Sequence, residues 1–555
     1  MNRDPVRSGR FSGRFSGRFS GRFAGPLARN GTLAAAITVA AAIAGPAAAQ
    51  TLNVGIAAPI TSIDPHFYNA GPNNGMANHI FRFLTTRDAN LRLRPDVAER
   101  WTAIGDTIWE FKLREGVTWH DGKPLTAEDV AFTAARAPNV PNSPGGFGGF
   151  LAGVERVEVV DPRTVRFHMS GPSPLLPGNM AAVALIAKHA AEGASTADFN
   201  SGKAAIGAGP YRMASYASGD RVVLERNDAY LPADPAERRA HWARVNYRMI
   251  VNDGGRVAAV LAGDVDIIDQ IPGNDLARLK ANSALTVYEI QGVRMVYGVV
   301  DYIRDNNQPN VTDNDGKPLP TNPFRDVRVR RALSLAINRE AIAERVMSGS
   351  AVPTGQWLPP GMFGANPEVK APGFDPEAAR RLLAEAGYPN GFRLTLATPN
   401  DRWASDAQTA QAIGQFWTRI GVQTQIEAHP WASYSARSAR NEFPVRMGSW
   451  GSSTGEASYT LVNVIGTRNR ETRWGAVNSF GYSNPALDAL TTRALATLDD
   501  EQREEILRQA VKLATDDVAI IPIHHLKNYW AARRGITYEA RADERTLATR
   551  VFPAN

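Results

Sequence analysis

The sequence GSWGSSTGEASYTLVNVIGT, residues 448–467, has residue types and spacing that could support nucleophilic chemistry. Within it, Gly451–Gly455 form the pattern G-x-S-x-G around Ser453, which in an α/β-hydrolase holds a serine nucleophile on a sharp strand-to-helix turn. That enzyme would need an acid and then a histidine further along the chain. The candidates in this order are Asp488 or Asp499 followed by His524 or His525. The pattern is common by chance, and no HGGG motif accompanies it. We therefore keep a serine hydrolase using Ser453 as an alternative and assign no catalytic residue in our main interpretation.

Metal chemistry is the second possibility, because the chain has nine histidines. His524 and His525 are adjacent, and on a strand their side chains would point to opposite faces, so they could not hold one ion together. The chain has no cysteine, which removes disulfides, thiolate metal sites and thiol nucleophiles. It also has no HExxH motif and no calcium-binding loop. We therefore expect no metal site and no cofactor.

The stretch Trp109–Phe132, WEFKLREGVTWHDGKPLTAEDVAF, predicts three elements that could position a site. Apolar and polar residues alternate over Trp109–Leu113, which is typical of a half-buried strand. Residues 120–124, HDGKP, supply turn chemistry. Thr126 and Asp129 form a capping box, which predicts that a helix begins there.

Strands and helices interleave along the rest of the chain, which favours α/β lobes. The block at residues 322–349 predicts two helices separated by Asn338. Asp375 is placed to cap another helix, which Gly387 would end. Only residues 137–150 and 306–323 are long and polar enough to be extended loops.

The stretch Trp109–Phe132 resembles the signature region of the family 5 extracytoplasmic solute-binding proteins, the dipeptide, oligopeptide and nickel-chelate receptors of ABC importers. Other segments resemble the same family in the same order: IDPH at 63–66, GAGPY at 207–211, the block at 322–349, NPALDAL at 484–490 and IIPIH at 520–524. The resemblance implies an α/β, periplasmic-binding-protein-like fold of two lobes (type II, the large three-subdomain form) with a ligand cleft between them. It also implies that residues 50–290 and 525–555 form lobe 1, with an inserted subdomain at about 86–207, and that 291–524 form lobe 2.

The resemblance also implies a ligand-binding segment at Trp450–Glu456. In peptide receptors of the family a tryptophan stands where Trp450 is, and an aspartate three residues later captures the α-amino group of the peptide. Here that place holds Ser453, which follows Gly451 and offers a neutral hydrogen bond, whereas a carboxylate gives about 1.5–3 kcal/mol to an ammonium group. Glu456 could reach the same place, although the acid of the family at that later position is not the anchoring one. Ser453 therefore leaves recognition of a free peptide N-terminus as an open question.

Four further residues are candidates for the cleft by the same resemblance. Tyr68 and Asn69 follow the IDPH segment, which in relatives brings a strand and loop to the ligand. Arg402 and Trp403 follow the predicted strand Arg393–Thr398. A guanidinium group at Arg402 could pair with a ligand carboxylate, while the Trp450 ring would offer apolar area for stacking.

Residues 1–49 have the composition of a signal peptide, with a basic region, an apolar run at Leu33–Ile43 and an A-x-A site that predicts cleavage after Ala49. The basic region contains FSGR three times. The segment holds seven arginines and one acid, a charge of +6, so the net charge of +7 leaves about +1 for residues 50–555. This near-neutral charge argues against nucleic acid as a partner, and Arg325, Arg328 and Arg331 are expected on a solvated helix face.

These observations predict a soluble periplasmic protein, because the apolar run is too short to span a membrane and no lipobox cysteine is present. We expect a monomer that captures a peptide or peptide-like solute and delivers it to an inner-membrane ABC permease and its ATPase. A nickel- or metal-chelate receptor of the same family is an alternative, since a receptor can hold the chelator rather than the ion. A chaperone-like or scaffold role is a third alternative.

Overall fold

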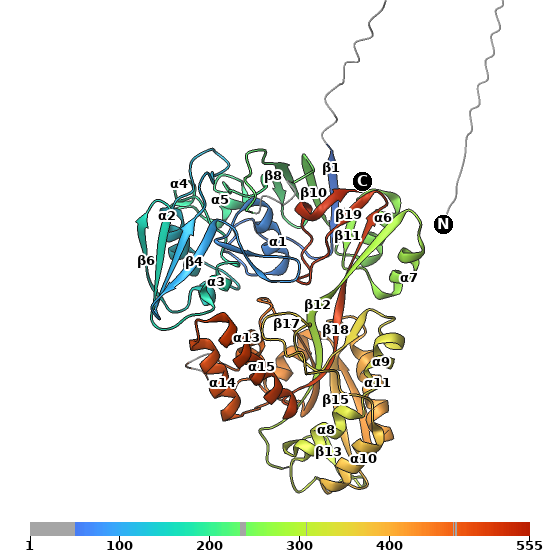
Figure 1. The fold of residues 1–555 in the computed structure, drawn as a ribbon. Helices are drawn as coiled ribbons and strands as arrows, with labels where there is room; N and C mark the ends of the chain where they lie inside the picture. The colour runs from blue at the N-terminus through green and yellow to red at the C-terminus, as the bar shows by residue number, and fades with distance from the viewer. Residues whose placement is uncertain (1–49, 234–239, 307, 470, 472–473, 555) are drawn as a thin grey trace, which may run out of the picture. The chain divides into compact units, whose positions relative to one another are not determined.

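Residues 50–233, 240–306, 308–469, 471 and 474–554 are described by the computed structural model, and the predicted signal peptide at 1–49 lies outside them. Twelve strands of these described residues form one mixed sheet (Figure 1). Its main path runs β13 (Val311–Thr312), β15 (Phe392–Pro399), β17 (Val445–Gly451), β12 (Leu285–Val300), β18 (Ile521–Arg533), β11 (Ile267–Asp269), β1 (Thr51–Ile56), β10 (Arg244–Met249), β9 (Arg221–Arg226) and β8 (Tyr211–Ala217). β16 (Val422–His429) pairs with β15, and β14 (Ala351–Pro353) pairs with β18.

The long antiparallel strands β12 and β18 join the two ends of this sheet (Figure 1). Their pairing begins at Leu285 opposite Arg533 and shifts register between Gln291 and Met295. Gly292 lies at the shift, where a Cβ atom would come within 2.6 Å of the Asn528 side-chain oxygen. A bulge with a glycine at a close approach is where a strand can bend.

Lobe 1 is the name we give to the part built on β1 and its neighbours. Its two cores surround Leu52 and Val257, and each is filled by branched and aromatic side chains of the sheet. The helices of this lobe are α1 (Gly71–Ile80), α6 (Asp253–Ala262) and α7 (Gly273–Ala281). Strands β19 (Ile536–Tyr538) and β20 (Val551–Pro553) pair beside it, with the short helix η6 (Ala548–Arg550) between them.

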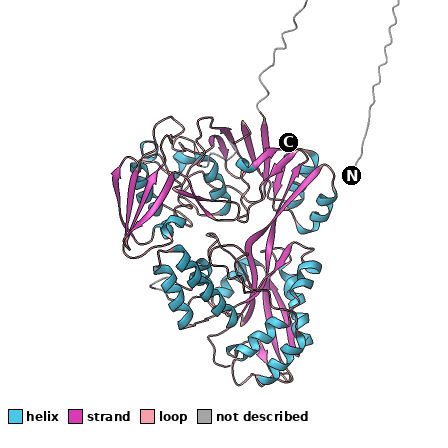
Figure 2. Ribbon diagram, viewed as in Figure 1, coloured by secondary structure: helices cyan, strands magenta, loops and turns pink. Residues whose placement is uncertain are grey.

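A separate core around Phe111 forms what we call the insert. Its described strands pair as β4 (Ala98–Ile104), β5 (Ile108–Leu113), β7 (Thr164–Met169) and β6 (Val154–Asp161), and β2 (Thr85–Arg87) pairs with β3 (Leu93–Pro95) (Figure 2). Its helices are α2 (Ala127–Arg136), η1 (Ala137–Asn139), η2 (Gly148–Leu151), α3 (Leu176–Asn179), α4 (Lys188–Ala191) and α5 (Thr196–Asn200). The predicted strand, turn and helix are confirmed: alternate residues of β5 are buried, and the Asp129 carboxylate accepts a hydrogen bond of 2.9 Å from the Thr126 N–H.

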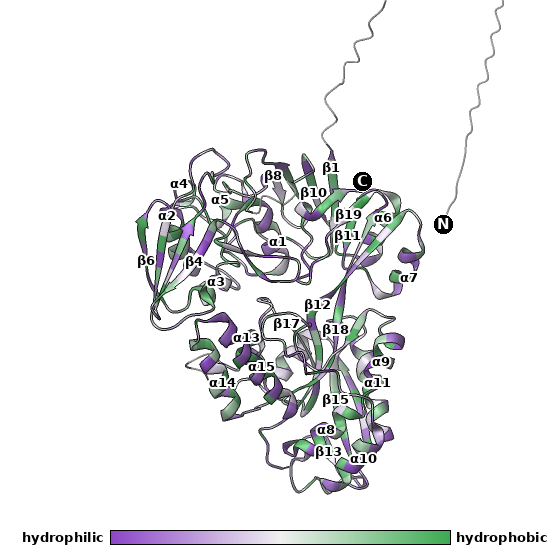
Figure 3. Ribbon diagram, viewed as in Figure 1, coloured by the Kyte–Doolittle hydropathy of each residue, from purple (hydrophilic) through white to green (hydrophobic). Residues whose placement is uncertain are grey.

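Lobe 2 holds two cores, one around Val296 and one around Ala457. Its helices are η3 (Pro323–Arg325), α8 (Val327–Leu335), α9 (Arg339–Ala341), the π-helical turn η4 (Ile342–Val346), α10 (Pro376–Glu385), α11 (Asp406–Arg419), α12 (Trp431–Ala439), α13 (Ala457–Thr460), the π-helical turn η5 (Leu461–Ile465), α14 (Pro485–Ala496) and α15 (Asp500–Asp516). Helices such as α10 carry both hydrophilic and hydrophobic residues (Figure 3), and Ala379 and Leu383 of α10 are buried.

Local predictions in lobe 2 are confirmed at residue level. The side chains of Asn338 and Asp375 each accept a hydrogen bond from a backbone N–H at the start of α9 and α10. The predicted loop at 306–323 includes the short strand β13. No helix among the described residues has the length and apolarity needed to cross a bilayer. The numbered boundaries of the lobes stay a prediction.

Candidate ligand-binding site

A cavity of about 620 Å³ lies between residues of the insert and residues of lobe 2. This volume falls within the roughly 300–1,000 Å³ of typical small-molecule sites. The side chains facing it are polar and charged as well as aromatic, so it suits a polar solute. They include Arg87, Leu91, Arg92, Trp101 and Trp109 on one side and Phe363, Glu456, Asp500, Arg503, Glu504 and Arg508 on the other.

Glu456 lies in this cavity but its carboxylate already has partners. Its Oε1 atom is 2.5 Å from the Arg503 guanidinium and accepts a hydrogen bond of 2.6 Å from the Ser458 hydroxyl. The Arg503 guanidinium also lies over the Phe363 ring, 4.3 Å from its centre. Because both charges are buried and paired, Glu456 forms part of the wall rather than an open site for an ammonium group.

A smaller cavity of about 30 Å³, which we call the narrow end, adjoins the large cavity and has room for roughly one water molecule. The two share Arg87, Leu91, Gly178 and Thr454. The narrow end is otherwise lined by Asn69, Asn74, Asn78, Thr86, Phe150, Ala181, Ala182, Ser453, Asp543 and Arg545. A third cavity, of about 110 Å³ inside lobe 1, shares Asp543 and Arg545 with the narrow end.

Arg87 is the cation placed between the large cavity and the narrow end. Its guanidinium donates hydrogen bonds of 3.0 Å to the Leu91 carbonyl and 3.2 Å to the Gly178 carbonyl. Burial lowers the pKa of Arg87 to about 10, and the negative charge of Glu456 only partly offsets this. Arg87 still carries its full charge at neutral pH.

A second cation, Arg545, reaches the narrow end from the C-terminal segment. The Asp543 carboxylate is held mainly by Arg541, with two contacts of 2.9 and 2.8 Å, while the Arg545 Nε atom is 3.6 Å away. Burial favours the protonated form of Asp543, but the charges of Arg541 and Arg545 outweigh it and lower the pKa of the carboxyl group. Arg545 is therefore a second cation in the lining of the narrow end.

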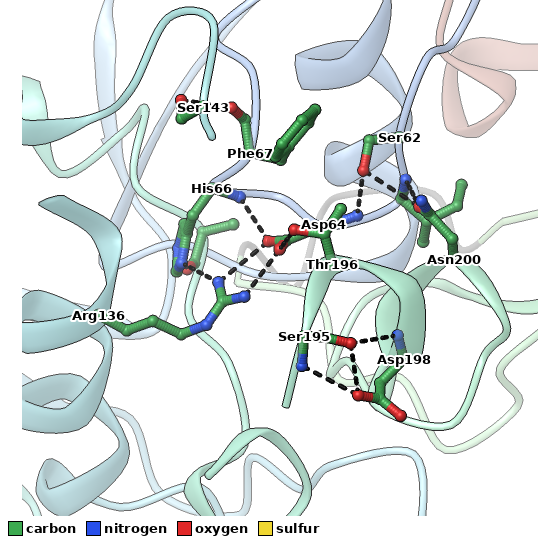
Figure 4. Close-up of polar contacts among 12 residues, drawn as sticks. Ser62, Asp64, His66, Phe67, Arg136, Ser143, Ser195, Thr196, Asp198 and Asn200 are labelled. Carbon is green, nitrogen blue, oxygen red and sulfur yellow. Dashed lines mark hydrogen bonds and ion pairs between the residues drawn. The ribbon is translucent and has the colours of Figure 1, made fainter. Parts of the chain in front are cut away.

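The IDPH segment precedes Asn69, which lines the narrow end, and Figure 4 shows the polar contacts that hold Asp64 and His66 of this segment. The Asp64 carboxylate is fully buried and contacts the Arg136 guanidinium at 3.0 and 2.7 Å. It also accepts hydrogen bonds from the Thr196 hydroxyl at 2.8 Å and from the His66 N–H at 3.1 Å. Burial opposes ionisation of Asp64, but Arg136 outweighs it, so the pKa is lowered and the group stays charged.

His66 completes this network as a neutral ring. Burial and the neighbouring Arg136 charge lower the pKa of His66 to about 4. Its Nε2 atom lies 2.8 Å from the Ala184 carbonyl and its Nδ1 atom 3.1 Å from the Arg136 guanidinium. The ring therefore donates from Nε2 and accepts at Nδ1.

Three of the residues proposed from the sequence line these cavities. Asn69 and the exposed Ser453 face the narrow end, and Glu456 faces the large cavity. Their roles in binding stay predictions.

The other five candidates lie outside the lining of these three cavities. The Tyr68 ring packs on Gly145, and Gly451 ends β17 opposite Arg294. The ring of Trp450 stacks on Tyr459 at 5.4 Å. The Arg402 guanidinium lies over the Trp431 ring at 5.0 Å, and Trp403 meets the same ring edge-on. Among them, the Trp450 and Trp403 ring nitrogens are buried without a hydrogen-bond partner.

Among the lining residues that the sequence did not single out are Arg87, Arg503 and Arg545. Arg87 is the last residue of a short strand, whereas Arg503 lies in α15 and Arg545 lies in the loop between β19 and η6. No local pattern indicates that these arginines line neighbouring cavities. The one local signal for Arg87 is its place at the end of a short strand whose first residue, Thr85, is buried.

Three of the residues named for the hydrolase alternative, Asp488, Asp499 and His525, have hydrogen bonds with other groups. Asp488 accepts a hydrogen bond from the Thr467 N–H, and Asp499 caps α15. His525 contacts the Gln291 side chain, while both ring nitrogens of His524 are buried without a partner. In the described part of the chain, no group of three or more His, Asp or Glu side chains is placed to hold a metal ion.

Comparison with known proteins gives the family of this chain. The model of the bacterial extracellular solute-binding proteins, family 5 middle region, matches residues 92–471. The glutathione-binding protein GsiB of Salmonella typhimurium is 28% identical over 506 residues, which cover 88% of this chain and 92% of that protein. The heme-binding protein A of Haemophilus influenzae is 26% identical and covers 84% of each chain.

Solved structures show the same fold. HbpA2 from Haemophilus parasuis superimposes with a TM-score of 0.78 at 24% identity, covering 91% of this chain and all of that one. The unliganded open form of the periplasmic murein tripeptide binding protein MppA gives a TM-score of 0.75 at 22% identity, covering 91% and 98%. The architecture is thus the α/β, two-lobed fold of periplasmic binding proteins. With the family model matching more than half of its length, the chain belongs to the family 5 bacterial extracellular solute-binding proteins.

Proposed function

We propose that the protein captures a peptide or peptide-like solute in the periplasm and delivers it to an inner-membrane ABC permease and its ATPase. The observation that carries this proposal is the cavity of about 620 Å³ lined from both the insert and lobe 2. A site built from two bodies can enclose a flexible polar solute when they approach each other. The similarity to glutathione-binding proteins over most of the chain supports a tripeptide-sized ligand.

The proposed mechanism is binding without chemistry. Closure about β12 and β18 moves the polar groups of the solute from water onto fixed donors and acceptors. To change the ratio of closed to open molecules from 1:99 to 99:1, the ligand must prefer the closed form by about 5.5 kcal/mol. We propose a monomer that is soluble and not lipid-anchored, with lobe 1 at 50–290 and 525–555, the inserted subdomain at about 86–207, and lobe 2 at 291–524.

The first expected result is stabilisation by a small peptide-like compound. At a hundredfold excess over its dissociation constant, a ligand adds about 2.7 kcal/mol to the free energy of unfolding. Thermal shift against glutathione, dipeptides, tripeptides, N-acetylated peptides, heme and nickel–histidine measures it, and native mass spectrometry identifies any compound that copurifies. A hydrolase would instead show stoichiometric phosphonate labelling lost in Ser453→Ala, and that result would overturn the proposal.

The second expected result concerns Ser453. A carboxylate introduced by Ser453→Asp lies in the space that Arg87 and Arg545 line, where it competes with an anionic ligand and can attract an amine. We expect N-acetylated peptides to bind wild type at least as well as free ones, and Ser453→Asp to shift the preference toward free amines. Calorimetry on matched peptide pairs measures this, with Ser453→Asn as the isosteric neutral control. Equal preferences in all three proteins would contradict it.

A further inference from the structure

We propose that the narrow end of the cavity is a subsite for a carboxylate group of the solute, with Arg87 and Arg545 as the residues that select it. This inference rests on the proposed function and adds the chemistry and orientation of the ligand. The solute would place its anionic end between the two guanidinium groups and extend the rest of its length into the large cavity.

Within the described part of the chain, Arg87 lacks a paired counter-charge. Among the described residues no carboxylate lies within ion-pair distance of its guanidinium, and its two hydrogen bonds go to neutral carbonyl oxygens. A charge that is largely removed from water and left unpaired is destabilising. A ligand carboxylate at the narrow end would supply the absent negative charge.

Arg87 is also held in a fixed position. Gly178 has no side chain where an added Cβ atom would lie 2.9 Å from the Arg87 NH2 atom. The guanidinium is therefore seated against the backbone of α3, with its direction set by the two carbonyl groups. A planar fork held in one orientation is suited to a carboxylate, which it can contact through two parallel hydrogen bonds.

The charge around the narrow end is positive on balance. Its lining has two cations, Arg87 and Arg545, and one acid, Asp543, whose closest contacts are to Arg541. The other polar lining groups are amides and hydroxyls. The Asn69 side-chain oxygen accepts a hydrogen bond of 2.7 Å from Asn74, which leaves the Asn69 amide N–H groups to donate. The surroundings favour an anion and disfavour an ammonium group.

The test uses glutathione and two analogues that each lack one of its two carboxylates. Calorimetry should show that loss of one particular carboxylate weakens binding to wild type by about 10- to 100-fold, the range of a charge-assisted hydrogen bond. Arg87→Gln and Arg545→Gln should lower glutathione affinity by a similar factor and no longer distinguish the acid from that analogue. If they bind glutathione like wild type, the subsite is wrong although the proposed function stands.

Matched variants separate a binding role from a structural one. Gly178→Ala keeps every charge but displaces the Arg87 guanidinium, so it should weaken binding as Arg87→Gln does. Arg100→Gln removes the same charge from an exposed position of β4 and should leave affinity unchanged. The melting temperature of ligand-free Arg87→Gln should be no lower than that of wild type. A marked drop, with no selective loss of the carboxylate effect, would make Arg87 a structural residue and overturn the inference.

Succinate tests the carboxylate subsite without assuming that the natural ligand is a peptide. Tens of millimolar succinate should raise the melting temperature of wild type and not that of Arg87→Gln. If no peptide binds and succinate still shows this difference, the peptide-like ligand is wrong and the carboxylate subsite stands. If succinate acts equally on both proteins and glutathione does not bind, both are overturned.

Discussion

Asp64→Ala is expected to lower the free energy of unfolding by about 3–5 kcal/mol, the loss typical when one partner of a buried ion pair is removed. The variant leaves the Arg136 guanidinium, the Thr196 hydroxyl and the His66 N–H without their shared acceptor. Urea unfolding measures the change. Because this network holds the segment leading to Asn69, ligand affinity should fall in parallel.

Two further variants decide whether the ion pair is the cause. Glu155→Ala removes an acid from an exposed position of β6 and should change stability by less than about 0.5 kcal/mol. Arg136→Met added to Asp64→Ala removes the stranded charge and should recover part of the loss. A loss below about 1 kcal/mol in Asp64→Ala, or no recovery in the double variant, would contradict the account.

Acid sensitivity is the second large effect. Burial lowers the pKa values of five histidines, to about 4 for His66, His79, His120 and His525 and to about 3 for His524. Their pKa in the unfolded chain is about 6.5, so between pH 6.5 and 4 the unfolded chain binds more protons. Stability is therefore complete above pH 6.5 and falls with acidification, by up to roughly 1.4 kcal/mol per pH unit for each ring.

The variant His524→Gln tests how much one of these histidines contributes to the loss of stability in acid. The His524 ring is buried with neither nitrogen hydrogen bonded, so its protonation in the folded state is strongly disfavoured. Unfolding free energies measured from pH 7 to 4.5 should fall less steeply in His524→Gln than in wild type. His189→Gln, which changes a more exposed ring next to Asp121, serves as the control for histidine loss. Parallel profiles for wild type and His524→Gln would refute the assignment.

Much of the local structure could be predicted because its signals are short-range. The alternation in β5, the capping box at Thr126 and the caps at Asn338 and Asp375 depend on residues within a few positions of each other. Such patterns act through the backbone of their own segment, and the structure confirms them. The order of the family motifs along the chain then indicated the fold.

The candidate site was less predictable because it depends on distant contacts. Arg87 and Arg545 come from opposite ends of the described chain and line one cavity because the C-terminal segment is bonded to the segment after β2, where the Ala542 N–H donates to the Ala89 carbonyl. Residues of one motif also differ in whether their side chains face the cavities. Ser453 faces the narrow end, whereas the ring of Trp450, three residues earlier, stacks on Tyr459. Side-chain direction at a strand end is set by packing, which local sequence does not encode.

The register shift between Gln291 and Met295 has a consequence for how the receptor reports occupancy. Two strands joined by backbone hydrogen bonds permit rotation chiefly at the point where their register shifts, whereas a flexible linker would allow the lobes many relative orientations. The empty and loaded states are then two discrete geometries with little between them. The permease would meet the receptor in one of two conformations. A compound that fills only part of the cavity would not produce an intermediate conformation.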